Sequence, residues 1–170
     1  MMRPPITLGI ATSNRVHLLR QTLESATSLR VPVDVAWELL VYDNNSTEDT
    51  RAVVESFAGR LPVRYLFEPK QGKAHALNRI VNEASGQWVL FTDDDVRLEP
   101  DWIEQYLAGI DGHAEADCFG GPVLPWLERS PGRLTLYLLR VFPWVMSVFA
   151  VPTLASMKLL LVVECSRPRK

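Results

Sequence analysis

Along the first part of the chain, continuous apolar runs alternate with stretches in which apolar residues recur at helical spacing. Apolar runs predict strands at Ile6–Thr12, Trp37–Tyr42, Val63–Phe67 and Gln87–Phe91. The near-continuous run of Trp37–Tyr42 is typical of a strand buried on both faces. The helical spacing predicts helices at Arg15–Leu29, Ser46–Ala58, Lys73–Ala84 and Pro100–Ile110. Strand–helix alternation with short links predicts an α/β domain with a mainly parallel sheet flanked by helices.

Some boundaries of these elements carry local signals. Ser46 and Asp49 have the spacing of a capping box that opens the second helix. Gly86 lies just beyond the third helix, where glycine commonly ends a helix. A further apolar segment, Cys118–Leu124, is a candidate fifth strand.

The composition changes near residue 128, after which the chain is mostly basic and apolar. We therefore expect a domain at 1–128 and a tail of uncertain structure at 129–170. Between Arg140 and Lys158 lie 17 uncharged residues, which is at the lower limit for a membrane span. Pro143 and Pro152 interrupt this stretch, and the charges of Arg140 and Lys158 flank it, which disfavours a clean span. The alternatives are a membrane-surface segment, so that the chain would associate with a membrane through residues 134–163, or a tail that is not the natural continuation of the domain.

Overall composition narrows the function classes. Apolar residues make up 47% and charged residues 22% of the chain, which are values of a globular protein. The net charge of −2 disfavours a nucleic-acid partner, which would call for a basic face. Cys118 and Cys165 show no metal-binding spacing, and the first residues lack the apolar stretch of a signal peptide. The expected location is the cytoplasm or the cytoplasmic face of a membrane.

Polar clusters follow three of the expected strands: Thr12–Arg15, Asp43–Ser46 and Asp93–Asp95. In an open parallel sheet, ligands bind beyond the carboxyl ends of the strands. Because those ends share one edge, we expect the three clusters to meet there. Their composition predicts a polar ligand.

The triple aspartate is the sharpest of these clusters. Adjacent carboxylates repel one another, and Mg²⁺ or Mn²⁺, which prefer hard oxygen ligands, would relieve that repulsion. On a loop, Asp93 and Asp95 can point to the same side, with Asp94 turned away as a spacer or supporting group. The alternative is a solvated acidic turn that caps the following helix.

Two further positions have both a functional and a structural interpretation. Asp43 could accept hydrogen bonds from a base or ribose, but Asp-Asn-Asn-Ser is also ordinary turn chemistry. Lys70–Lys73 precedes a helix, where Gly72 and Lys73 could meet a diphosphate. A surface turn with solvated lysines is the alternative, and the P-loop pattern is absent.

Taken together, these segments resemble family 2 glycosyltransferases, whose nucleotide-binding domain has the Rossmann-like GT-A fold. They occur in the family's order and at about its spacing, from residue 6 to about residue 125. The segments that carry the resemblance are Ile6–Thr12 leading to Asn14–Arg15, Val41–Thr47, Gly72–Asn78 and Val89–Asp95.

The resemblance implies a donor site for a nucleotide-diphosphate sugar. Thr12 and Asp43 would line the nucleotide pocket, with Asp43 on the base, and Lys73 would lie near the base or the diphosphate. Asp93 would face the ribose and the cation, and Asp95 would coordinate the cation, commonly Mg²⁺ or Mn²⁺. Asp94, between them, completes the expected donor-site set.

The resemblance also implies sugar transfer to an unknown acceptor (a glycan, a lipid or another molecule), typically with inversion and a carboxylate general base. After Gly120–Pro122 the chain offers only Glu128 and Glu164, neither in a familiar context. We therefore expect a chain that is truncated or altered after about residue 128. The general base is unassigned, and donor binding without transfer is an expected alternative.

Two other functions fit part of the pattern. A nucleotidyltransferase also combines aspartates, a metal and an α/β sheet, but would place a glycine-rich basic loop where this chain has Thr12–Arg15. A non-catalytic domain could bind a nucleotide, or dock at a membrane through its apolar tail.

Overall fold

The computed structural model describes residues 5–113, 115–121 and 158–161. Its core is a parallel sheet with the strand order β3-β2-β1-β4-β5. The strands are β1 (Ile6–Thr12), β2 (Trp37–Asp43), β3 (Val63–Phe67), β4 (Trp88–Asp93) and β5 (Lys158–Leu161). The helices are α1 (Val16–Ala26), α2 (Thr50–Glu55), α3 (Lys73–Glu83) and α4 (Trp102–Gly112). The expected α/β class, with a parallel sheet flanked by helices, is confirmed.

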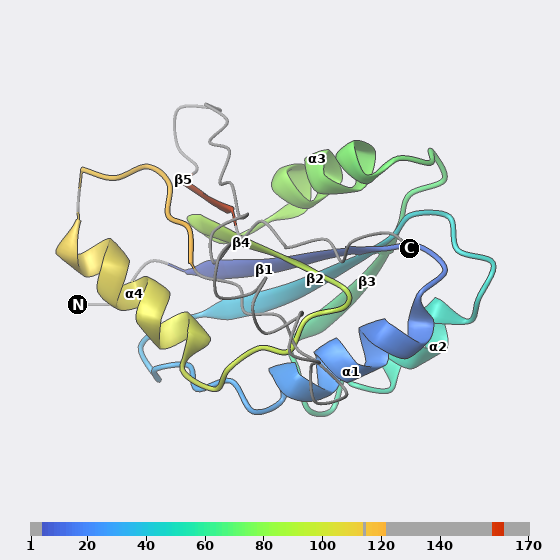
Figure 1. Ribbon diagram of the computed structural model, residues 1–170, viewed down its shortest axis with the longest axis horizontal. Helices are drawn as coiled ribbons and strands as arrows, with labels where there is room; N and C mark the ends of the chain where they lie inside the picture. Colours follow the sequence, from blue (N-terminus) through green and yellow to red (C-terminus); the bar gives the residue numbers. More distant parts are fainter. Residues whose placement is uncertain (1–4, 114, 122–157, 162–170) are drawn as a thin grey trace, which may run out of the picture.

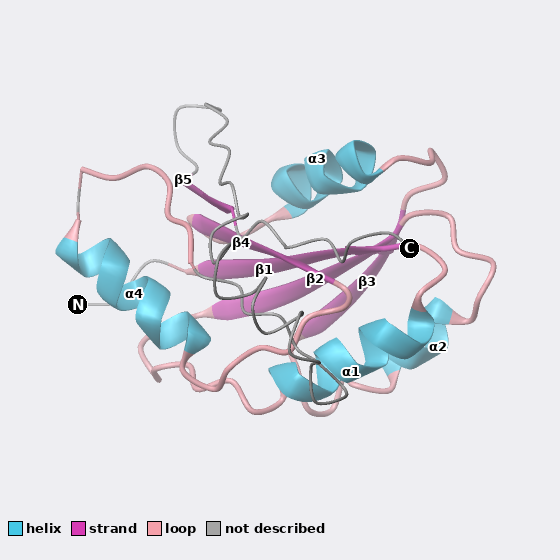
Figure 2. Ribbon diagram, viewed as in Figure 1, coloured by secondary structure: helices cyan, strands magenta, loops and turns pink. Residues whose placement is uncertain are grey.

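Helices cover both faces of the sheet (Figures 1 and 2): α1, α2 and α4 lie on one side and α3 on the other. Alternate residues of the central strands enter two separate hydrophobic clusters. Leu8 and Ile10 pack on the side of α1, α2 and α4, whereas Ala11 packs with Ala76 and Ile80 of α3. Both faces of β1 are therefore buried, which explains why this strand is mostly apolar and carries no charged residue.

The register of the sheet places the polar strand ends beside one another. Thr12 at the end of β1 pairs with Asp43 at the end of β2. On the other side, Ala11 pairs with Asp93 at the end of β4. The three polar clusters expected from the sequence thus share the carboxyl edge of the sheet.

The capping box expected at Ser46 and Asp49 is wrong. Helix α2 begins at Thr50, and the Asp49 side chain alone caps it by accepting from the Ala52 amide. The Ser46 hydroxyl instead accepts a hydrogen bond from the Asn14 amide at 2.9 Å. A contact with the neighbouring loop has therefore displaced the local helix-capping bond.

Gly86 does not end helix α3 as expected. The helix stops at Glu83, followed by Ala84 in an extended conformation. Gly86 instead packs against the backbone of β1, where its amide donates to Thr7 Oγ1 at 2.9 Å. A Cβ atom at this position would lie 2.4 Å from the Thr7 nitrogen. The glycine is needed for the close approach of two backbones.

Gly86→Ala should therefore destabilise the domain by about 2 kcal/mol, because neither backbone can move away without disturbing the sheet. Urea unfolding followed by circular dichroism measures the change. Gly59→Ala is the matched control, since a Cβ there meets nothing within 4 Å. Equal stabilities of the two variants would contradict the packing role of Gly86.

The candidate strand at Cys118–Leu124 is also wrong for the residues that the structure describes, 118–121, which are not in a strand. Phe119 instead packs on Trp88, with ring centroids 5.6 Å apart. The edge of β4 that faces away from β1 pairs with β5, which lies in the segment that we expected to be the tail. Residues 122–124 lie outside the described part of the chain.

Among the described residues, no helix is long and apolar enough to cross a membrane. Of the apolar segment 134–163, only residues 158–161 are described, as strand β5. The expected membrane association through this segment therefore stays a prediction.

Candidate functional site

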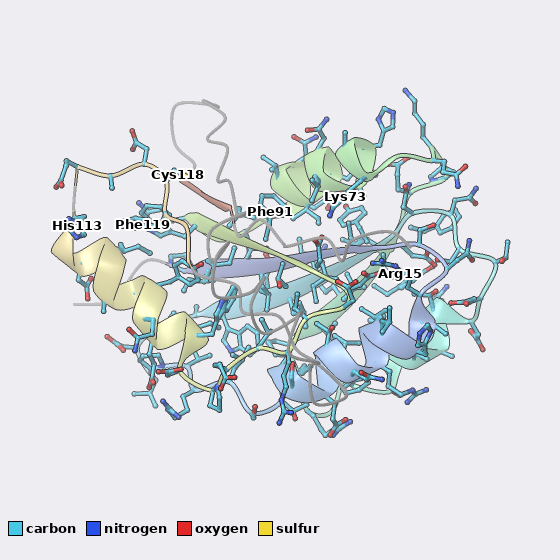
Figure 3. The ribbon with its side chains drawn as sticks, in the orientation of Figure 1. Arg15, Lys73, Phe91, His113, Cys118 and Phe119 are labelled. Atoms are coloured by element: carbon cyan, nitrogen blue, oxygen red, sulfur yellow. The ribbon has the colours of Figure 1, made fainter. Side chains whose placement is uncertain are left out.

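A cleft with a volume of about 240 Å³ opens at the carboxyl edge of the sheet. Its walls come from the ends of β1, β2 and β4 and from the start of α3. In Figure 3, Arg15 and Lys73 lie at this end of the sheet, and His113, Cys118 and Phe119 lie at the other. The cleft is lined by Ala11, Thr12, Ser13, Arg15, Asn44, Lys73, Asp93 and Asp94.

Asp94 forms the buried base of the acidic cluster, with a side chain that is only 3% exposed. Its Oδ2 accepts from the Thr12 hydroxyl at 2.7 Å, and its Oδ1 accepts from Arg15 Nη1 at 2.7 Å. Burial raises the pKa of the Asp94 carboxyl above its ordinary value, against the opposing effect of these two bonds. Asp94 thus ties the end of β4 to the end of β1.

Arg15 links two of the aspartates. The Nη1 atom that bonds Asp94 also lies 3.2 Å from Asp95 Oδ2. The other oxygen of Asp95, Oδ1, is buried and has no hydrogen-bond partner among the described residues. The guanidinium therefore partly neutralises the cluster and leaves one carboxylate oxygen of Asp95 unsatisfied.

Arg15→Met should lower the free energy of unfolding by about 1–2 kcal/mol, because it leaves the buried Asp94 carboxylate with Thr12 alone. This is less than the roughly 3–5 kcal/mol of a fully buried pair, since the Arg15 side chain is 48% exposed and partly screened by water. Urea denaturation at neutral pH measures the loss. Arg20→Met, an exposed change on helix α1, is the control; equal effects would show that the pair adds nothing specific.

Lys73 and Asp93 meet across the cleft. Lys73 is the first residue of α3, and its ammonium pairs with Asp93 Oδ1. The lysine side chain is 61% exposed, whereas that of Asp93 is 14% exposed. The cation is therefore reachable from solvent and able to move to another anion.

Asp43 lies next to the cleft but is not part of its lining. The side chain is buried, with Oδ1 accepting from the Ser46 amide at 2.9 Å and Oδ2 from the Tyr65 hydroxyl at 2.8 Å. Burial and the bond to Asp43 raise the pKa of Tyr65 to about 12. Tyr65 therefore stays a neutral donor that fixes the orientation of the carboxylate.

Some contacts of the site were not predicted from the sequence. Arg15 and Asn44 belong to the polar clusters, but neither had an assigned role. Tyr65 lies in an ordinary strand pattern, which gave no signal. Each acts through a partner distant in sequence, which a local pattern does not identify.

The acidic residues offer part of what the expected Mg²⁺ or Mn²⁺ would need. The described residues contain no group of three or more His, Cys, Asp or Glu side chains arranged to hold a metal ion. Asp93 and Asp95 do offer carboxylate oxygens, one of which is buried without a partner. Mg²⁺ is commonly bound by one or two carboxylates together with substrate phosphates. The residues fit a cation that is shared with a phosphate ligand.

Comparison with known proteins places this site in context. The sequence matches the model of glycosyl transferase family 2 over residues 7–136. It is 33% identical over 143 residues to validoxylamine A glucosyltransferase of Streptomyces hygroscopicus subsp. limoneus, covering 82% of this chain and 31% of the relative. It is 27% identical over 140 residues to the succinoglycan biosynthesis protein ExoM of Rhizobium meliloti, covering 77% and 45%. The chain thus spans about a third to a half of the length of these relatives.

Solved structures share the fold. S. aureus TarS 1–349 in complex with UDP-GlcNAc superposes with a TM-score of 0.61 and 23% identity, over 72% of this chain and 37% of that one. The mannosyltransferase PcManGT from Pyrobaculum calidifontis, in complex with GDP-Man and Mn²⁺, gives a TM-score of 0.58 and 29% identity, over 71% and 36%. The expected GT-A fold is confirmed by these neighbours. With its family match and its relatives, this chain belongs to glycosyl transferase family 2.

Proposed function

We propose that the cleft binds a nucleotide-diphosphate sugar together with Mg²⁺ or Mn²⁺, and that the sugar is then transferred to an acceptor. The observation that carries this proposal is the meeting of carboxylates and cations at the carboxyl edge of the sheet. Carboxylates suit the metal, and the cations Arg15 and Lys73 suit a diphosphate. PcManGT, which binds GDP-Man and Mn²⁺, supports the same combination.

Each residue has a proposed role. Asp95 and Asp93 hold the cation, which when bound offsets the negative charge of the departing nucleoside diphosphate. Asp43 accepts a hydrogen bond from the base, and Lys73 meets the diphosphate. Thr12 lines the nucleotide pocket, where its hydroxyl holds Asp94 in place. Asp94 supports the donor site through these contacts with β1 and Arg15.

The size of the cleft bears on how a donor would sit. Its volume of about 240 Å³ is below the roughly 300–1,000 Å³ of most small-molecule sites. A nucleotide sugar would therefore extend beyond the lining residues. We propose that the part extending past Asn44 meets Asp43, which lies next to the cleft.

The chemical step we propose is attack of an acceptor hydroxyl on the anomeric carbon with inversion, assisted by a carboxylate base. The base stays unassigned, because Glu128 and Glu164 lie outside the described residues. Hydrolysis of UDP-GlcNAc or GDP-mannose, measured as release of the free sugar, distinguishes a chain that can break the bond to the diphosphate from one that only binds the donor. The acceptor (glycan, lipid or other) is left open.

Titration calorimetry with uridine and guanosine diphosphates, with and without Mn²⁺, tests the proposal. We expect binding of at least one diphosphate that weakens when the metal is removed by a chelator. Tight binding that does not depend on the metal, or no binding at all, would count against the donor site. Pyrophosphate release from a nucleoside triphosphate would instead support a nucleotidyltransferase.

Location is a separate proposal. We propose that the chain lies in the cytoplasm, and the alternative is that it binds the cytoplasmic face of a membrane through residues 134–163. Flotation with anionic lipid vesicles measures that association directly. A chain that stays with the soluble fraction would contradict membrane docking.

A further inference from the structure

One buried side chain, Asn44 at the end of β2, holds the loop that precedes helix α3. Its Oδ1 accepts from the Gly72 amide at 2.7 Å. Its Nδ2 donates to the Lys70 carbonyl at 2.8 Å and lies 3.4 Å from the Glu68 carbonyl. Asn44 is only 5% exposed, so water does not replace these bonds. The loop is thereby attached to the edge of the sheet by both ends of a single amide.

The attached loop determines where helix α3 begins, and therefore where its first residue, Lys73, lies. Gly72 is the N-cap of α3 and adopts a φ of 134°, a conformation that L residues rarely take. Lys73, the next residue, reaches over the cleft to Asp93. A chain of contacts therefore runs from Asn44 through Gly72 and Lys73 to Asp93, and joins the end of β2 to the end of β4.

Asn44 is itself fixed to β1, so it forms a rigid anchor. The backbone amide of Asn44 donates to the Thr12 carbonyl at 2.8 Å. The backbone carbonyl of Asn44 accepts from the Ser13 hydroxyl at 3.1 Å. Any displacement of Asn44 would disturb the cleft lining at β1 as well, which makes its side chain a stable reference point for the loop.

We propose that Asn44 is a positioning residue for the donor diphosphate, which it serves by fixing the loop that carries Lys73. The inference rests on the proposed function, in which Lys73 meets the diphosphate. The side-chain amide meets both demands of the site, because its oxygen accepts from Gly72 while its NH2 group donates to Lys70. An aspartate has the same shape but offers only acceptors, so an oxygen would face the Lys70 carbonyl.

A double-mutant cycle tests this coupling. We compare wild type, Asn44→Asp, Lys73→Met and the double variant by calorimetry with uridine or guanosine diphosphate and Mn²⁺. Asn44→Asp should weaken binding about tenfold in the wild-type background. In the Lys73→Met background the same change should weaken it by less than about twofold, because the residue it positions is gone.

Asn45→Asp is the matched control. It adds the same charge one residue away, on an exposed side chain that no described residue hydrogen-bonds. We expect less than about a twofold change, since a charge alone does not alter the loop. Thermal unfolding of every variant accompanies the titrations, and Asn44→Ser replaces Asn44→Asp if the latter does not fold.

The outcomes separate the two proposals. If wild type binds a diphosphate and the Asn44 change has equal effects in both backgrounds, or none, the positioning role is overturned and the donor site stands. An equal loss in Asn45→Asp would likewise assign the effect to charge and overturn it. If wild type binds neither diphosphate, the proposed function fails, and the positioning role fails with it.

Discussion

Asp95→Asn is expected to weaken Mn²⁺-dependent binding of a nucleoside diphosphate by at least about a hundredfold. Changes in the groups that merely support metal ligands commonly cost 10–100-fold, and Asp95 is proposed as a ligand itself. Its Oδ1 is buried without a hydrogen-bond partner among the described residues, and the change replaces this carboxylate with a neutral amide, which is a weaker ligand for a divalent cation. Calorimetry with and without Mn²⁺ measures the loss.

The metal-free baseline makes this result specific. Asp95→Asn should bind the diphosphate without Mn²⁺ about as wild type does, because Asp95 is proposed to contact the donor only through the metal, and the amide oxygen of asparagine can still accept from Arg15. Asp111→Asn, the same change on an exposed residue of α4, should keep the full metal effect. An Asp95→Asn protein whose affinity still rises with Mn²⁺ as in wild type would rule out Asp95 as the metal ligand.

Asp43→Asn should weaken diphosphate binding by about tenfold to a hundredfold, which is the loss of one hydrogen bond to a charged acceptor. The fold should survive, because an amide can still accept from the Ser46 amide and donate to the Tyr65 hydroxyl. The loss should be similar with and without Mn²⁺, since Asp43 is proposed to act on the base. Titrations in both conditions measure it.

The comparison with inorganic pyrophosphate gives the control for Asp43. Pyrophosphate lacks a base, so its Mn²⁺-dependent binding should be unchanged in Asp43→Asn. An equal loss for pyrophosphate and for the nucleoside diphosphate would place Asp43 at the phosphate end of the site. Unchanged affinity for both ligands would remove Asp43 from the donor site altogether.

Much of the fold could be predicted because its signals are local. Strands β1 and β4 are buried on both faces, so their sequences are mostly apolar, and the apolar spacing of α1 and α3 marks their buried sides. The signals that we interpreted wrongly, at the start of α2 and the end of α3, belong to residues whose partners are distant in sequence. Gly86, in the link between α3 and β4, packs against Thr7 of β1, and Ser46 bonds Asn14 of another loop. Such contacts exist only once the sheet has formed.

The candidate site was foreseeable at the level of clusters, because parallel strands bring their carboxyl ends to one edge. Its internal contacts were not. The sequence predicts that Asp93–Asp95 follow a strand, but not that Arg15 pairs with Asp94 and Asp95. Nor does it show that Tyr65 fixes Asp43, because a tyrosine in a strand is ordinary packing. These pairings depend on the register and on side-chain geometry.

The position of the bound metal tests the account most directly. In nuclear magnetic resonance spectra of the wild-type chain with uridine or guanosine diphosphate, Mn²⁺ broadens the amide signals of nearby residues, and Mg²⁺ gives the unbroadened reference. We expect the strongest broadening at Asp93–Asp95 and Thr12. Signals of Ile6 and Gly86, about 20 Å away at the amino ends of the strands, should persist longest. Broadening that is strongest at those amino ends, or uniform over the chain, would contradict a metal and donor site at the carboxyl edge.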